Sequence, residues 1–151
     1  MVRPLVEGER NKVEHEAHEG KEGHEGVQSG LEDLSRVVVD AGLKVHRTLG
    51  AGLLESVCER CLANELELRG HKVLRQVALP VTYEGMTMEA GFRLDLVVDD
   101  AIIIEIKAVE ALSRLHEAQI LTYLRLSGLG MGFLMNFNVV LFKQGLRRFV
   151  Q

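Results

Sequence analysis

Residues 92–107 constrain the fold of this chain more than any other stretch. Apolar and polar residues alternate on both sides of a polar pair, Asp99-Asp100, which is typical of two half-buried β-strands joined by a turn. The apolar face consists of Leu94, Leu96 and Val98 on the first strand and of Ile102, Ile104 and Ile106 on the second. For both sets to lie on one side of a sheet, residue 96 must pair with residue 104. That register predicts a three-residue loop over 99–101, or an equivalent bulge.

The same register brings three charged side chains together. Asp95 pairs with Glu105, and Lys107 leaves the second strand on the same face as Glu105. Two carboxylates about 5 Å apart across a strand pair repel each other unless a proton or a cation lies between them. Their oxygens suit Mg²⁺ or Mn²⁺, and a neighbouring lysine can orient a bound water or stabilise charge on a phosphate. The alternative interpretation is a surface salt bridge on the solvent face of a hairpin.

The remaining chain predicts helices and further strands around this hairpin. Apolar residues at helical spacing predict helices over 31–49 and 53–69, separated by Gly50-Ala51-Gly52. Strands are expected over 72–83, 87–98, 102–109 and 131–136, a helix capped by Ser113 over 114–126, and a last hairpin of 139–142 and 146–150. Pro80 suggests an edge or a break in the first strand. The order ααβββαββ, with the first of the last two strands intact or split, predicts an α/β domain with a central mixed sheet flanked by helices.

Residues 1–30 differ in composition from residues 31–151, which we assign to the folded domain. The first 30 residues hold seven glutamates, four basic residues, three histidines and five glycines, with almost no periodic apolar pattern. Such a segment buries too little apolar surface to offset its ordering entropy, so we expect a disordered or loosely helical acidic tail. Its histidines, His15, His18 and His24, could bind a transition metal weakly, although a solvated tail is the favoured interpretation.

Charge and cysteine content limit the classes of protein. The chain has 18 basic and 22 acidic residues, and subtracting the tail's four and seven leaves 14 against 15, a net charge of −1. A near-neutral domain is not an evident sequence-independent DNA binder, although basic side chains can gather locally. Cys58 and Cys61, three apart on a predicted helix, are interpreted as core residues. No apolar run approaches the roughly 20 residues that span a bilayer and no signal peptide is evident, so a cytoplasmic protein without membrane contact is expected.

Glu55 is a carboxylate on an otherwise apolar helical ridge. The other members of that ridge are Ala51, Cys58, Leu62 and Leu66. A carboxylate in such surroundings is expected to be protonated, paired or close to a metal. Alternatively, it is a first-turn charge favoured by the helix dipole.

Gln119 and Tyr123 are four residues apart on the predicted third helix, so both side chains can face one cleft. His116 lies one turn earlier and is a further candidate. The alternative is an ordinary amphipathic helix on which Gln119 and Tyr123 bond to each other. His46 is expected to be structural. The sequence has no nucleotide-binding glycine-rich loop after a strand and no serine nucleophile elbow, so the carboxylate–lysine cluster is the main catalytic candidate.

The arrangement Asp95…Glu105-Ile106-Lys107 resembles the core motif of the PD-(D/E)XK nuclease superfamily. From about residue 34 to residue 150 the chain is similar to the small bacterial GxxExxY proteins of that superfamily. The matching segments are residues 46–57, 93–96, 105–110, 116–124 and 136–138. One position departs from the pattern, because Cys58 stands where those proteins have the tyrosine of their name.

The resemblance implies a restriction-endonuclease-like core and metal-dependent hydrolysis of phosphodiester bonds in nucleic acid, with DNA favoured over RNA. It assigns Asp95, Glu105 and the main-chain carbonyl of Ile106 to a Mg²⁺ or Mn²⁺ ion. Lys107 would position the attacking water, and Glu55 and Gln119 would orient the metal shell or the substrate. Weaker candidates for substrate contact are Arg93, His116 and Tyr123.

A non-catalytic module that binds nucleic acid or protein with the same fold is the rival hypothesis. The near-neutral charge and the missing tyrosine favour it, whereas the mutually repelling carboxylates have no evident purpose without a cation. A purely structural scaffold would leave Glu55 unexplained. The sequence leaves a homodimer open.

Overall fold

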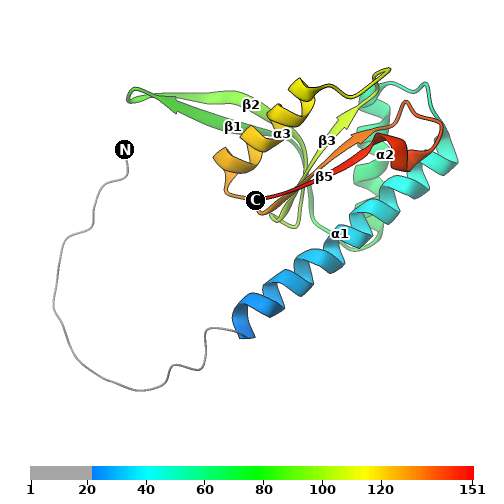
Figure 1. Ribbon diagram of the computed structural model, residues 1–151, viewed down its shortest axis with the longest axis horizontal. Coiled ribbons are helices and arrows are strands. Elements are labelled where there is room, and N and C mark those ends of the chain that lie inside the picture. The colour runs from blue at the N-terminus through cyan, green and yellow to red at the C-terminus, as the bar shows by residue number, and fades with distance from the viewer. Residues whose placement is uncertain (1–21) are drawn as a thin grey trace.

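The computed structural model describes the backbone of residues 22–151 and the side chains of residues 30–151. Its elements are α1 (Glu22–Leu49), α2 (Glu55–Leu68), β1 (Val73–Tyr83), β2 (Met86–Val98), β3 (Ile102–Lys107), α3 (Arg114–Ser127), β4 (Met131–Asn136), the 3₁₀ helix η1 (Phe142–Gly145) and β5 (Leu146–Val150). The order of helices and strands is the expected ααβββαββ, with a short 3₁₀ helix added before the last strand (Figure 1).

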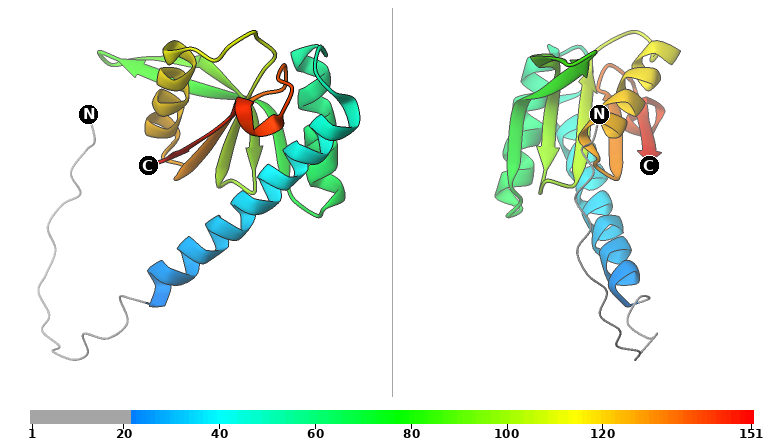
Figure 2. Two further views of the ribbon diagram at one scale, coloured as in Figure 1. Left: turned by 45° about the vertical axis from the view of Figure 1, so that its right-hand side comes forward. Right: turned by 90° about the vertical axis from the view of Figure 1, so that its left-hand side faces the viewer.

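The five strands form one mixed sheet in the order β1-β2-β3-β4-β5. Neighbouring strands are antiparallel except β3 and β4, which are parallel and are connected through α3. Helices α1 and α2 cover one face of the sheet, and α3 covers the other (Figure 2). This arrangement confirms the predicted α/β class with a central mixed sheet flanked by helices.

The β2–β3 hairpin has the predicted register. Leu96 pairs with Ile104 and Val98 pairs with Ile102, which leaves residues 99–101 as the loop. Asp99 and Asp100 have φ angles of 50° and 52°, and the Ala101 amide donates to the Val98 carbonyl at 2.9 Å. Two successive left-handed residues match the twist of an antiparallel hairpin, and aspartate tolerates that conformation better than most residues do.

The alternating residues of this hairpin supply both layers of the core. Leu96 and Ile104 are fully buried against α1 and α2. Val97 and Ile103 point to the opposite face and pack with the α3 residue Leu124. Strand β3 is therefore buried on both faces, as is usual for a central strand that has a parallel neighbour.

The edge strand β1 contains the expected irregularity at Pro80. The register of β1 with β2 shifts between Leu79 and Val81, and within residues 22–151 no strand pairs with the other side of β1. Proline lacks the N–H that a ladder requires, so an edge strand is where it is tolerated. The turn that follows is formed by Glu84 and Gly85, both with positive φ.

The strand predicted over residues 139–142 is wrong. The chain forms a loop and then η1 at this point, while β5 pairs directly with β4. The apolar residues of the segment serve a different packing: Phe142 is buried against α1, and a Cβ on Gly42 of α1 would lie 2.6 Å from its ring. The Val139 carbonyl lies 2.7 Å from His46 Nε2, so α1 rather than a strand satisfies this backbone group.

The first helix begins earlier than the helix predicted over 31–49. Helix α1 begins at Glu22, so residues 22–30 of the proposed tail form its first turns. Residues 1–21 lie outside the described part of the chain, and so does the disorder expected there. The predicted weak metal binding by His15, His18 and His24 lies outside it too, since the side chain of His24 is not described. Within residues 22–151, no helix is long and apolar enough to cross a bilayer.

Candidate active site

A cavity of about 420 Å³ lies where the start of α2, strands β1 and β2, the end of β3 and helix α3 meet. Its lining consists of Glu55, Ser56, Glu59, Gln76, Arg93, Asp95, Glu105, Ile106, Lys107, Gln119 and Tyr123. Eight of the nine site residues named from the sequence are in this set, and His116 is the exception. Residues separated by more than sixty positions in the chain are brought together by the fold.

Asp95 and Glu105 each bind the backbone of the opposite strand. Backbone pairing of β2 with β3 ends at Leu96 and Ile104, one position before these two residues. The Asp95 amide donates to Glu105 Oε1 at 3.1 Å, and the Ile106 amide donates to Asp95 Oδ2 at 2.9 Å. The two carboxylates thus replace the next bonds of the ladder, and the backbone amides at the point where β2–β3 pairing ends fix their positions.

Glu105 is the most strongly perturbed carboxyl group in the cavity. Only 5% of the residue is exposed. Burial, followed by repulsion from Asp95, raises the pKa of Glu105 from 4.5 to about 8, while Lys107 acts in the opposite direction. At neutral pH this group therefore retains a proton unless a cation takes the place of that proton.

Glu55 stands in the first turn of α2 and faces the same cavity. The residue as a whole is exposed, yet burial on the cavity side raises the pKa of its carboxyl group. Lys107 lowers this pKa and Asp95 raises it, so Glu55 is electrostatically linked to the cluster on the sheet. Leu54 at the N-cap makes no side-chain capping bond, so the position also agrees with a charge favoured by the helix dipole.

Helix α3 supplies Gln119 and Tyr123. Tyr123 is buried, and its ring meets the edge of Phe92 at a centroid distance of 5.3 Å. Burial and the two sheet carboxylates raise the pKa of Tyr123 to about 12, so its hydroxyl stays protonated. Among the hydrogen bonds of residues 30–151 none joins Gln119 to Tyr123, so the internal pair considered as an alternative is not formed.

His116 is used in the cap of α3 and does not line the cavity. Its amide donates to Ser113 Oγ at 3.3 Å, and its Nδ1 accepts from the Ser113 amide at 3.1 Å. This is a capping box with histidine in the position that glutamate or glutamine usually takes. His116 still lowers the pKa of Glu55, which places it near the rim. Arg93 lines the cavity from β2.

Three cavity residues, Ser56, Glu59 and Gln76, were not identified from the sequence as site residues. Only 6% of Glu59 is exposed, and its two carboxylate oxygens accept from Gln76 Nε2 at 3.0 and 2.9 Å. The same Nε2 lies 3.3 Å from Asp95 Oδ1. Glu59 follows Glu55 by four residues on α2, which is a usable signal. Nothing in the pattern of β1 distinguishes Gln76.

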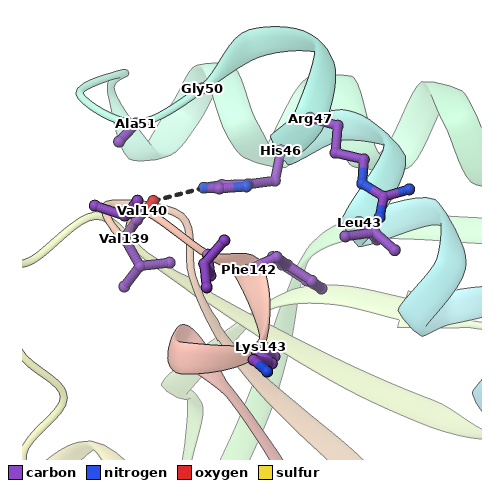
Figure 3. A pocket seen from close by; sticks show the side chains of 10 residues that line it. Leu43, His46, Arg47, Gly50, Ala51, Val139, Val140, Phe142 and Lys143 are labelled. Atoms are coloured by element: carbon purple, nitrogen blue, oxygen red, sulfur yellow. Dashed lines mark hydrogen bonds between the residues drawn. The ribbon is translucent and has the colours of Figure 1, made fainter.

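A second cavity, of about 600 Å³, is larger but has different chemistry (Figure 3). Its lining is mainly apolar, with Arg47 and Lys143 as its basic side chains, and it contains none of the predicted site residues. His46 points across it toward the Val139 carbonyl and is buried, in agreement with its expected structural role. Because this cavity has no carboxylates, the acidic cavity is the better candidate for an active site.

The donor set of the acidic cavity fits a hard divalent cation. Asp95, Glu105 and the main-chain carbonyl of Ile106 offer oxygen atoms only, and Mg²⁺ commonly takes one or two carboxylates and keeps several waters. No three His, Cys, Asp or Glu side chains of residues 30–151 are grouped as ligands of one ion. The fit therefore depends on two carboxylates whose repulsion, visible in the raised pKa of Glu105, a cation would relieve.

The fold and the acidic cavity together define a mixed α/β protein with a carboxylate–lysine site at the end of a central strand. A family model described as the PD-(D/E)XK nuclease superfamily matches residues 32–149. The chain belongs to the PD-(D/E)XK nuclease superfamily, and its sheet with flanking helices is consistent with a restriction-endonuclease-like fold. Membership supports a nuclease-like function with a nucleic acid as substrate. Comparisons with curated proteins and with solved structures gave no match.

Proposed function

We propose that this protein is a metal-dependent nuclease that hydrolyses phosphodiester bonds, with DNA favoured over RNA as its substrate. The observation that carries the proposal is the Asp95–Glu105 pair, in which each carboxylate is fixed by the backbone of the other strand while Lys107 lines the same cavity. Two carboxylates held this close, one of them buried, favour a bound cation. Superfamily membership supports the same chemistry.

Asp95, Glu105 and the main-chain carbonyl of Ile106 would hold Mg²⁺ or Mn²⁺. When bound, such an ion acidifies a water molecule and neutralises charge on a phosphate. Lys107 would hold the attacking water and stabilise the charge that develops on the phosphate oxygens. The oxygen of that water forms a bond to phosphorus, and the bond to the leaving oxygen on the opposite side breaks.

The remaining cavity residues would position the substrate. We assign Glu55 and Gln119 to the orientation of the metal shell or of the scissile phosphate, because one borders the cavity from α2 and the other from α3. Arg93 and Tyr123 are in reach of the same space, and His116 would act from the rim as part of the α3 cap. A neutral tyrosine hydroxyl can donate to a phosphate oxygen, which agrees with the raised pKa of Tyr123.

The chain is proposed to belong to the GxxExxY group within the superfamily. Glu55 would be the helix glutamate of that pattern, and Cys58 stands at the position of its tyrosine. Only 1% of Cys58 is exposed, and it packs in the core formed with α1 and the sheet. Cys58 itself is therefore a core residue and does not line the cavity that holds Asp95 and Glu105.

The proposal is tested by cleavage of linear double-stranded DNA, single-stranded DNA and RNA with Mg²⁺ or Mn²⁺. Asp95→Ala and Lys107→Ala should abolish the cleavage shown by the wild-type protein. Asp100→Asn, which changes an exposed carboxylate in the loop of the same hairpin, is the matched control and should keep full activity.

Each other outcome has a definite meaning. Equal cleavage by wild type and both variants would indicate a contaminating nuclease. Absence of cleavage of all three substrates, together with metal binding that depends on Asp95, would support the non-catalytic binding module instead.

A further inference from the structure

Gln76 has a backbone conformation that is unusual for its place in the sheet. Its φ angle is 53°, in the left-handed region, although it lies in the middle of strand β1. The register is the same on both sides of it, with Arg75 opposite Leu96 and Val77 opposite Leu94. Gln76 is thus opposite Asp95 without pairing to it. A residue with a Cβ rarely takes this conformation within a strand, and it persists only where the surroundings hold it.

The distortion changes the direction of the Gln76 side chain. Successive residues of a regular strand point to opposite faces of the sheet. Here Arg75 and Gln76 both reach Glu59 of α2: Arg75 Nε lies 3.5 Å from Glu59 Oε1, and Gln76 Nε2 lies 2.9 Å from Oε2. The left-handed backbone therefore turns the amide of Gln76 toward α2 and into the acidic cavity.

The turned amide completes the hydrogen bonding of the Asp95 carboxylate. Asp95 Oδ2 accepts from the Ile106 amide, and Gln76 Nε2 lies 3.3 Å from Oδ1. A carboxylate has about four lone-pair positions, so each oxygen can still bind a cation while its plane is fixed by these two donors. Both oxygens of the almost fully buried Glu59 side chain accept from Gln76 Nε2, so the amide nitrogen of Gln76, and not its carbonyl oxygen, is held at Asp95.

We propose that Gln76 is a positioning residue for the metal ion, acting through Asp95, and that Glu59 holds the Gln76 amide in place. This inference rests on the proposed function, in which Asp95 binds the metal. It gives the backbone distortion of β1 a function: the distortion brings the Gln76 amide to Asp95. A strand of regular geometry would point this side chain to the other face. Outer partners of metal ligands fix the orientation of those ligands, and their removal typically weakens metal binding by about 10–100-fold.

The test is a titration of the full chain with Mn²⁺, in which electron paramagnetic resonance measures the concentration of free ion. Asp95→Asn defines the component of binding that belongs to the cavity, since other parts of the chain can bind Mn²⁺ weakly. Gln76→Gly accepts the left-handed backbone and removes the amide, whereas Gln76→Asn keeps an amide that is one methylene shorter. We expect both to weaken the Asp95-dependent binding by about 10–100-fold.

Glu84→Gly is the matched control, because Glu84 also has a positive φ, of 48°, but lies in the exposed turn between β1 and β2. It should leave Mn²⁺ binding unchanged. Thermal unfolding in EDTA shows whether each variant is folded, and Gln76→Asn carries the test if Gln76→Gly is not. Binding within twofold of wild type in both Gln76 variants would overturn the inference alone. Binding that is unaffected by Asp95→Asn would overturn the proposed metal site and this inference together.

Discussion

The burial of Glu105 makes a quantitative prediction about the dependence of stability on pH. Its pKa is raised from 4.5 to about 8, so between these values the folded protein holds a proton that the unfolded chain has released. The contribution of this group to stability is fully present below pH 4.5 and is lost as the pH rises through about 8. One pKa unit corresponds to about 1.4 kcal/mol, which gives a total loss of about 5 kcal/mol, of which about 3 kcal/mol is lost by pH 7.

Glu105→Gln removes this titration and keeps the size and the acceptor oxygen of the side chain. Urea unfolding in EDTA, at several pH values from 4.5 to 9, gives the free energy of unfolding of each protein. Wild type should lose about 4 kcal/mol more than Glu105→Gln across this range, because part of the total is already lost at pH 4.5. All other ionisable groups are shared, so the difference between the two curves reports the Glu105 carboxyl group together with its coupling to Asp95 and Lys107.

Glu110→Gln is the control, because Glu110 is an exposed carboxylate shortly after the same strand, and its variant should follow the wild-type curve. The reasoning would be refuted by parallel pH profiles of wild type and Glu105→Gln, or by wild-type stability that rises between pH 5 and 8. In either case Glu105 would be ionised in the folded protein at neutral pH, and its burial would not favour a cation.

Two further predictions follow from contacts of the site and of the fold. Lys107→Met should move the titration of the Glu105 carboxyl to higher pH, because Lys107 lowers the pKa of Glu105. Carbon-13 NMR of labelled glutamate measures the midpoint of this titration. An unchanged or lower midpoint would contradict the coupling. Gly145→Ala should destabilise the protein by at least about 1–3 kcal/mol in urea unfolding, since a Cβ there would lie 2.1 Å from the Asn136 carbonyl oxygen. Gly130→Ala, whose Cβ would be 3.7 Å from the nearest atom, is its control, and equal losses in the two variants would show that this contact is easily relieved.

The sheet and much of the cavity could be predicted because apolar and polar residues alternate along the central strands, and few strand registers keep each set on one face. With isoleucines at 102, 104 and 106, a slip of one residue would move them to the face opposite Leu96 and Val98. The apolar pattern therefore determined the register, and Asp95 and Glu105 came together as a consequence. The helix residues Glu55 and Gln119 were recovered from helical spacing and from the family resemblance. Their roles remain proposals.

The failures have a common physical origin in tertiary contacts that leave no periodic signal. In residues 139–142, Phe142 packs against α1 while Val140 and Leu141 are exposed, and local alternation does not distinguish such a segment from a strand. In the sequence Gln76 resembles any polar residue on an edge strand. Its contact with Asp95 depends on a positive φ angle that the residue pattern does not predict. Glu59 was not identified because the predicted ridge of α2 continued from Glu55 to Cys58, three residues on, and not to Glu59, four residues on.

The position of each cavity residue in the sheet has a consequence for motion. Glu105 and Lys107 belong to β3, which pairs with β4 along its whole length and with β2 as far as Ile104. Gln76 belongs to β1, whose outer side pairs with no strand among residues 22–151. Local opening is easiest at a sheet edge and hardest in its centre. Glu105 and Lys107 are thus expected to open less readily than Gln76, which would orient the metal ligand Asp95. Partial loosening of β1 would withdraw the Gln76 amide from Asp95. Metal affinity and the rate of cleavage would then both fall when the edge strand opens, although Glu105 and Lys107 keep their places in β3.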